Sequence, residues 1–191
     1  MKLVLWDNPS GKTAYTAAQV LKDLAKANEV WKKAGIQFVA DGAVTENAAS
    51  ATKVDVNDEG NFWARVSSDA SLVKMAAYTA KKNGDITVDY VPAITKEAPD
   101  ERPFFGFNYA QGATRWAPVT LSVVSEQDAG KTTLAHELGH ILLGPDHVDD
   151  KNNLMYKESS ALTGEVGTEL TGSQIEAARE AAARIETEQP Q

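Results

Sequence analysis

The chain has 191 residues, of which 42% are hydrophobic and 24% charged, so its composition is that of a globular protein rather than a disordered one. It carries 19 Lys and Arg against 27 Asp and Glu, and the net charge of -8 argues against nucleic acid or anionic membranes as partners. Cysteine is absent, which excludes disulfides, thiolate metal sites and cysteine nucleophiles, so any metal must be held by histidines and carboxylates.

The sequence predicts no membrane-spanning or targeting segment. No apolar run approaches the roughly 18 residues of a spanning helix, and the run at Lys2–Trp6 meets Asp7 too early to form the core of a signal peptide. We expect a secreted or periplasmic protein if a signal peptide has been removed, and a cytoplasmic protein otherwise.

The N-terminal part predicts two strands around one long helix. Lys2–Trp6 is a short apolar run before a turn cluster, which is typical of a strand. Residues 13–34 predict a helix that ends at Gly35, and residues 36–40 predict a second strand. The helix repeats apolar residues every three or four positions, which predicts a buried face made of Ala17, Val20, Leu21, Leu24, Ala27 and Trp31.

The middle of the chain carries weaker patterns. Residues 41–67 are interpreted as a loop with one hairpin near residues 62–66, and residues 68–83 as a helix capped by Ser68 or Asp69. Three further strands are predicted from β-branched and aromatic runs, at residues 85–94, at a short edge strand of residues 104–110, and at residues 119–124.

Two more helices are predicted from capping boxes. Ser125, followed by Asp128, is expected to open a helix over residues 126–143. Thr171, followed by Gln174, is expected to open a C-terminal helix, whose apolar face would contain Ile175, Ala178, Ala182 and Ile185.

The three histidines of the chain all lie within twelve consecutive residues, 136–147. On the predicted helix, His136 and His140 are one turn apart on the same face, so their imidazoles can bind one tetrahedral zinc ion. Glu137 lies one position round the helix, where it suits a water on the metal rather than the metal itself. Zinc acidifies its bound water and polarises a carbonyl, and a carboxylate beside it can move the proton to a leaving amine, so this H-E-x-x-H pattern predicts amide hydrolysis.

The segment that follows resembles the metzincin clan of zinc metallopeptidases. Gly144 to His147 keeps the spacing of the family motif, in which the glycine turns the chain and a third histidine returns to the metal. The next residues, V-D-D-K-N-N-L-M-Y, resemble the matrixin segment, with Asp150 three residues after the histidine. The resemblance implies that Met155 is the methionine of the turn beneath the metal, with Tyr156 and Asp150 in supporting roles.

One feature departs from the family pattern. Three residues, 141–143, separate His140 from Gly144, where the family has two. An added helical residue turns the chain by about 100°, so His147 would need a different helix end, for example a π-bulge. Counted from His136, Asp146 occupies the position of the third ligand instead. His147 is favoured, because imidazole is the commoner zinc ligand and the downstream register fits it.

Two other readings remain open. A thermolysin-like site would take its third ligand from a later glutamate, namely Glu158, Glu165 or Glu169. The chain could also be a non-catalytic, zinc-stabilised module that binds a peptide or protein, although Glu137 argues against this, since a pure metal site needs no base.

The resemblance implies a single α+β domain over residues 1–191, with a metzincin-like, mixed and mostly parallel twisted sheet packed on three main helices. Residues 1–144 would hold the sheet and the helices up to the active-site helix, and residues 145–191 a small C-terminal part with the Met-turn and the final helix. The expected function is a zinc-dependent endopeptidase with one catalytic Zn²⁺. Its partners would be a protein or peptide substrate and a candidate proteinaceous inhibitor.

Overall fold

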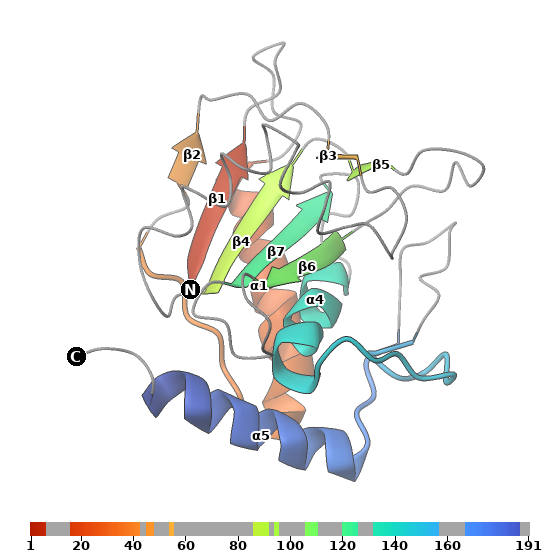
Figure 1. Ribbon diagram of the computed structural model, residues 1–191. Helices are drawn as coiled ribbons and strands as arrows, with labels where there is room; N and C mark the ends of the chain where they lie inside the picture. The colour runs from red at the N-terminus through yellow and green to blue at the C-terminus, as the bar shows by residue number, and fades with distance from the viewer. Residues whose placement is uncertain are drawn as a thin grey trace.

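Figure 1 shows the computed structural model of the chain. The structure describes residues 1–6, 16–42, 45–47, 54–55, 86–91, 94–95, 106–110, 120–125, 132–156 and 167–187. The hairpin predicted near residues 62–66 and the helix predicted over residues 68–83 lie outside these ranges. Within them, no helix is long and apolar enough to cross a bilayer.

Five short strands form one sheet in the described part of the chain (Figure 1). From one edge to the other the strands are β2 (Thr45–Asn47), β1 (Lys2–Trp6), β4 (Ile86–Val91), β7 (Thr120–Ser125) and β6 (Gly106–Ala110). β1 is parallel to β2 and to β4, and β4 is parallel to β7, whereas β6 runs antiparallel to β7 and forms one edge.

The strand predicted at residues 85–94 is divided in two. β4 ends at Val91, and Ile94 belongs to β5 (Ile94–Thr95), which pairs in parallel with β3 (Val54–Asp55). Pro92 stands between the two strands in the sequence. A proline has no N–H to donate to a ladder, which explains why one long strand was a wrong prediction.

The strand predicted at residues 36–40 is also wrong, because these residues belong to no strand. The side-chain amide of Asn28 binds both backbone groups of Phe38 instead. The Phe38 N–H donates to Asn28 Oδ1 at 2.7 Å, and Asn28 Nδ2 donates to the Phe38 carbonyl at 2.9 Å. These bonds satisfy the groups that a neighbouring strand would have satisfied, while Phe38 still buries its ring.

Helix α1 (Ala17–Trp31) begins four residues later than predicted. Thr16 is extended and caps the helix, since its Oγ1 accepts from the Gln19 N–H and its own N–H donates to Gln19 Oε1. A short 3₁₀ turn, η1 (Lys32–Ala34), follows, and Gly35 ends it with a φ of 71°, as the sequence predicts. Leu21 was placed on the buried face but is 49% exposed.

Helix α4 (Thr133–Leu143) begins later than the predicted residue 126. Ser125, interpreted as the cap of this helix, is the last residue of β7 and pairs with Val91 of β4. The rest of the capping pattern, from residue 126 to residue 131, lies outside the described residues. The corresponding prediction for helix α5 (Gly172–Thr187) is confirmed, since Gln174 N–H donates to Thr171 Oγ1 and Thr171 N–H donates to Gln174 Oε1.

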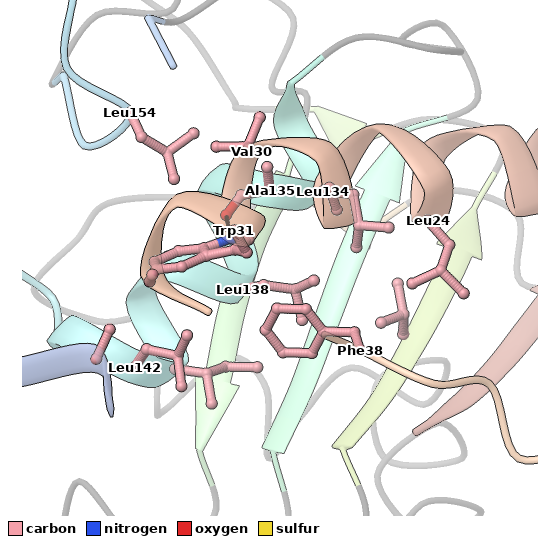
Figure 2. Packing of buried hydrophobic residues seen from close by; sticks show 14 of the residues in the cluster. Leu24, Val30, Trp31, Phe38, Leu134, Ala135, Leu138, Leu142 and Leu154 are labelled. Atoms are coloured by element: carbon pink, nitrogen blue, oxygen red, sulfur yellow. Dashed lines mark hydrogen bonds between the residues drawn. The ribbon is translucent and has the colours of Figure 1, made fainter. Parts of the chain in front are cut away.

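The hydrophobic core lies where α1 and α4 pack together beside the sheet (Figure 2). Trp31, at the end of α1, is fully buried and donates its Nε1–H to the Ala135 carbonyl of α4 at 3.0 Å. Its ring meets Phe38 edge to face, with the centroids 6.4 Å apart. One buried side chain thus holds α1, α4 and the segment after η1 together. Helix α5, the last helix of the chain, also packs against α4 (Figure 1).

Gly139 of α4 lies where Met155 packs against that helix. A Cβ built on Gly139 would collide with Met155 Sδ and would also lie 3.4 Å from Trp31 Cζ2. Met155 and Trp31 are both fully buried, so neither side chain has free space to move into. The missing side chain at residue 139 therefore lets the segment of Met155 approach α4.

We expect Gly139→Ala to destabilise the fold by about 1–3 kcal/mol, since overpacking outweighs the gain of about 1 kcal/mol in helix propensity. Gly172→Ala is the matched control, because nothing lies within 4 Å of a Cβ built there at the start of α5. Urea unfolding of both variants checks this. Equal stabilities would contradict the close packing of Met155.

Candidate metal centre

Two of the three histidines project from α4 one turn apart. The Nε2 atoms of His136 and His140 are 3.1 Å apart, and their ring planes are nearly perpendicular, with the centroids separated by 4.7 Å. A spacing of four residues places both rings on one face of the helix. The helix geometry therefore aims the two Nε2 atoms at a common point.

His147 reaches the same point from the segment after the helix. Its Nε2 lies 3.3 Å from Nε2 of His136, and its ring centroid is 4.7 Å from that of His140. One potential ligand atom from each of the three histidines lies within 4.8 Å of the other two, and no other group of this kind occurs in the described part of the chain. Asp146, the alternative third ligand, is exposed and is not part of the group.

The chain leaves α4 through Gly144 without a π-bulge. The Gly144 N–H donates to the His140 carbonyl at 3.0 Å, which is the ordinary α-helical pattern, and the helix is regular up to Leu143. Gly144 then adopts φ 94° and ψ -173°, a region that is essentially restricted to glycine. The extra residue before Gly144 therefore extends the helix, and the turn at Gly144 redirects the chain.

Two backbone carbonyls hold the rings of the helical histidines. His136 Nδ1 lies 2.6 Å from the Leu154 carbonyl oxygen, and His140 Nδ1 lies 2.9 Å from the Gly144 carbonyl oxygen. A carbonyl oxygen only accepts, so both Nδ1 atoms carry the proton and both Nε2 atoms of the neutral rings carry a lone pair. Two lone pairs 3.1 Å apart repel each other unless a cation lies between them.

The donor set fits zinc. Nitrogen ligands 2.0–2.1 Å from a tetrahedral zinc lie about 3.3 Å from one another, and the two Nε2 distances to His136 are 3.1 and 3.3 Å. Imidazoles whose other nitrogen donates to a carbonyl are the usual form of histidine ligands. His136, His140 and His147 are therefore the residues of the described chain that would hold a zinc ion.

The electrostatics keep these rings in the metal-binding form. The pKa of His136 is lowered from 6.5 to about 3, first by burial and then by His140 and His147, whereas the bond to the Leu154 carbonyl raises it. Burial also lowers the pKa of His140, with His147 acting in the same direction and the Gly144 carbonyl opposing. Both rings are therefore neutral at neutral pH.

The other predicted residues lie around this cluster. Glu137 follows His136 in α4 and is only 4% exposed. Met155 is fully buried against α4, and Tyr156 follows it, half-buried. Asp150 is exposed, and its Oδ1 accepts the Asn152 N–H at 3.0 Å within the turn between His147 and Met155.

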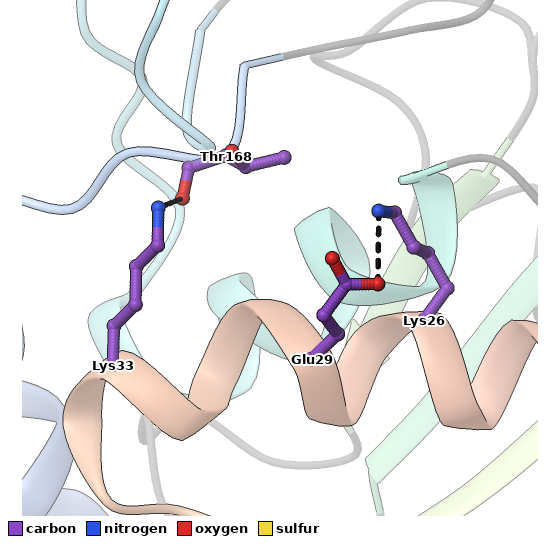
Figure 3. Close-up of polar contacts among 4 residues, drawn as sticks. All are labelled: Lys26, Glu29, Lys33 and Thr168. Carbon is purple, nitrogen blue, oxygen red and sulfur yellow. Dashed lines mark hydrogen bonds and ion pairs between the residues drawn. The ribbon is translucent and has the colours of Figure 1, made fainter.

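The glutamate of a thermolysin-like site is not at the cluster. Glu169 is exposed and forms an ion pair with Lys33, with Nζ and Oε1 2.8 Å apart. Figure 3 shows the same lysine reaching the neighbouring Thr168 carbonyl. Glu169 is absent from the metal-competent group, and Glu158 and Glu165 lie outside the described residues.

Sequence reasoning missed the groups that orient the histidines. The Leu154 carbonyl carries no side-chain signal, and Gly144 was recognised for its turn but not for its carbonyl. Asn153 and Gln174, which hold the segment around Leu154, were missed for this role as well, although Gln174 was identified as part of a capping box. The contact between Asn153 and Gln174 joins residues 21 positions apart, so no local pattern indicates it.

Two solved structures show a fold similar to that of this chain. Metalloproteinase-II from Bacteroides fragilis matches 95% of this chain with a TM-score of 0.59 and 17% identity. Archaemetzincin from Methanopyrus kandleri matches 96% of this chain and 96% of its own length, with a TM-score of 0.52 and 16% identity. This chain shares its fold with these two proteins.

These likenesses concern the fold, because the identities are low. The chain covers 52% of the Bacteroides fragilis protein, or about half of its length. No protein-family model matches the sequence, and no curated protein matches it either.

The depressed pKa of His136 predicts how the metal-free protein responds to acid. Below pH 6.5 the unfolded chain binds a proton at this residue that the folded chain does not bind until about pH 3, so stability falls as the pH is lowered through this window. We expect the stability advantage of the wild type over His136→Gln to shrink by up to about 1.4 kcal/mol per pH unit. Urea unfolding with chelator, from pH 7.5 to 4.5, checks this. A difference in stability between the two proteins that does not change with pH would contradict it. The titration of carboxylates contributes to both proteins alike and therefore cancels from this difference.

Proposed function

We propose that this chain is a zinc-dependent endopeptidase of the metzincin type, with one catalytic Zn²⁺ held by His136, His140 and His147. The observation that carries the proposal is the convergence of the three imidazoles, two of which have their Nδ1 protons tied to carbonyls. The metallopeptidase fold supports it independently. Glu137, buried in the same turn of α4 as His136, supplies the base that a pure metal site would not need.

The proposed chemistry divides between the metal and the chain. Zinc supplies a Lewis acid, which acidifies water and polarises the scissile carbonyl. Glu137 accepts the proton of the attacking water and then delivers it to the leaving amine nitrogen. The carbonyls of Leu154 and Gly144 hold two of the ligand rings throughout, and the buried Met155 packs against α4 at Gly139.

A peptide is the substrate class that this arrangement favours. In metzincins an extended peptide pairs with the edge strand of the sheet, and β6 has β7 as its partner and lies at the edge of the described sheet.

We propose residues 1–191 as one catalytic domain with Tyr156 and Asp150 in supporting roles. The net charge of -8 favours neither nucleic acid nor an anionic membrane as a partner. A proteinaceous inhibitor would compete for the same edge.

The role of Glu137 is tested with Glu137→Gln. We expect the variant to bind zinc as the wild type does and to lose roughly 10²- to 10⁴-fold or more in hydrolysis of casein, because the amide cannot accept the proton. Glu176→Gln, at an exposed position of α5, is the control and should remain fully active.

Activity in Glu137→Gln would remove this residue from the mechanism. A wild type that binds zinc stoichiometrically but cleaves neither casein nor a peptide library would instead favour a non-catalytic binding module.

The identity of the third ligand is tested by comparing His147→Ala with Asp146→Ala. Loss of a direct ligand weakens zinc binding far more than loss of a neighbouring residue, whose removal costs about 10–100-fold at most. We expect His147→Ala to bind zinc poorly and to be inactive, and Asp146→Ala to keep its metal. Zinc content after dialysis and residual casein hydrolysis report the two outcomes, and the reverse ranking would assign the ligand to Asp146.

A further inference from the structure

A pair of side-chain amides joins the C-terminal helix to the segment beneath the histidines. Asn153 Nδ2 donates to Gln174 Oε1 at 2.8 Å, and Gln174 Nε2 donates back to Asn153 Oδ1 at 3.2 Å. Gln174 belongs to α5, and Asn153 lies two residues before Met155. The pair therefore bridges two parts of the chain that are remote in sequence.

Gln174 does more than cap its own helix. In a capping box the side chain at this position binds the backbone N–H of the cap residue, as Gln174 does with Thr171 at 2.8 Å. Its second and third bonds, to Asn153, have no part in the cap. Asn153 is only 2% exposed, so its amide depends on protein partners, and Gln174 is its side-chain partner on both polar atoms.

Asn153 in turn fixes the residues that follow it. Its Oδ1 also accepts the Met155 N–H at 2.9 Å, which closes a tight turn around Leu154. The Leu154 N–H donates to the Glu169 carbonyl at 2.9 Å. The peptide groups on both sides of Leu154 are thus held, and the Leu154 carbonyl points at His136 Nδ1, 2.6 Å away.

We propose that Gln174 is a positioning residue of the metal centre, which acts through Asn153 on the Leu154 carbonyl that orients His136, so that docking of α5 and zinc affinity are coupled. The inference rests on the zinc site of the proposed function. Coupling between two sites is reciprocal, so zinc must stabilise the docked α5 as much as the docked α5 favours zinc.

The test measures zinc affinity by competition with a chromophoric chelator, in folded wild type and variants. We expect Gln174→Ala to weaken zinc binding by about 10- to 100-fold, the usual cost of removing a group that orients a ligand. Thr171→Ala is the matched control, because it removes the hydroxyl cap of the same helix and leaves the amide pair intact. It should bind zinc as the wild type does. Gln174→Glu keeps the cap but places a carboxylate oxygen against Asn153 Oδ1, where Gln174 Nε2 donates in the wild type, so it should weaken zinc binding as Gln174→Ala does.

A second measurement follows hydrogen exchange in α5. Zinc should slow exchange of the α5 amides in the wild type and in Thr171→Ala, and should slow it much less in Gln174→Ala. Asn153→Ala should weaken zinc binding at least as much as Gln174→Ala, because it also removes the acceptor of the Met155 N–H. In the double variant the two losses should be less than additive, because both changes remove the same amide pair.

Equal zinc affinities for Gln174→Ala and Thr171→Ala, or exchange in α5 that does not respond to zinc, would overturn the proposal. A wild type that binds no zinc would overturn it together with the centre. Neither measurement depends on peptidase activity. A wild type that binds zinc but cleaves nothing would therefore contradict the proposed hydrolysis alone. The zinc affinities of the variants would still decide whether α5 and the metal centre are coupled.

Discussion

The hydrogen bond from His136 Nδ1 to the Leu154 carbonyl is the contact on which the centre depends most. It fixes the tautomer of the most buried histidine of the cluster, so the lone pair on Nε2 faces His140 and His147 rather than the backbone. Burial holds the pKa of this ring near 3, so a proton does not occupy the lone pair at neutral pH. A cation bound between the Nε2 atoms would remove the repulsion between their lone pairs.

The packing of α4 makes that bond geometrically available. Trp31 ties α1 to α4 by its bond to the Ala135 carbonyl, one residue before His136, so the start of the site is anchored in the core. One turn later, Gly139 allows Met155 to lie directly against the helix. Because Leu154 precedes Met155, this close approach also sets how near the Leu154 carbonyl comes to His136. Core packing and ligand orientation are thus two effects of the same contact.

The spacing of residues 136–140 was enough to predict which side chains would meet, because helical periodicity is a local property of the chain. His147 could be favoured over Asp146 only by general ligand preference and by the register of the segment that follows it, since the path after the helix depends on the dihedral angles of Gly144. The carbonyls of Leu154 and Gly144 could not be predicted, because every residue has a carbonyl and only the tertiary fold decides which one faces a ring. For the same reason, the sequence did not indicate that the Asn28 side chain binds the backbone of Phe38. Residues 36–40 have the pattern of a strand, although they pair with no other strand.

The turn at Gly144 explains why one additional residue does not displace the third histidine. The Gly144 N–H donates to the His140 carbonyl, and His140 Nδ1–H donates to the Gly144 carbonyl, so the two residues are joined by a reciprocal pair of hydrogen bonds. The direction in which the chain leaves α4 is therefore tied to the orientation of the His140 ring rather than to the number of residues counted from His136. His147 follows Gly144 by three residues and returns to the cluster from that fixed point. The interval from Gly144 onward is hence the one that places His147. The reciprocal pair holds Gly144, which must adopt a positive φ, four residues after His140.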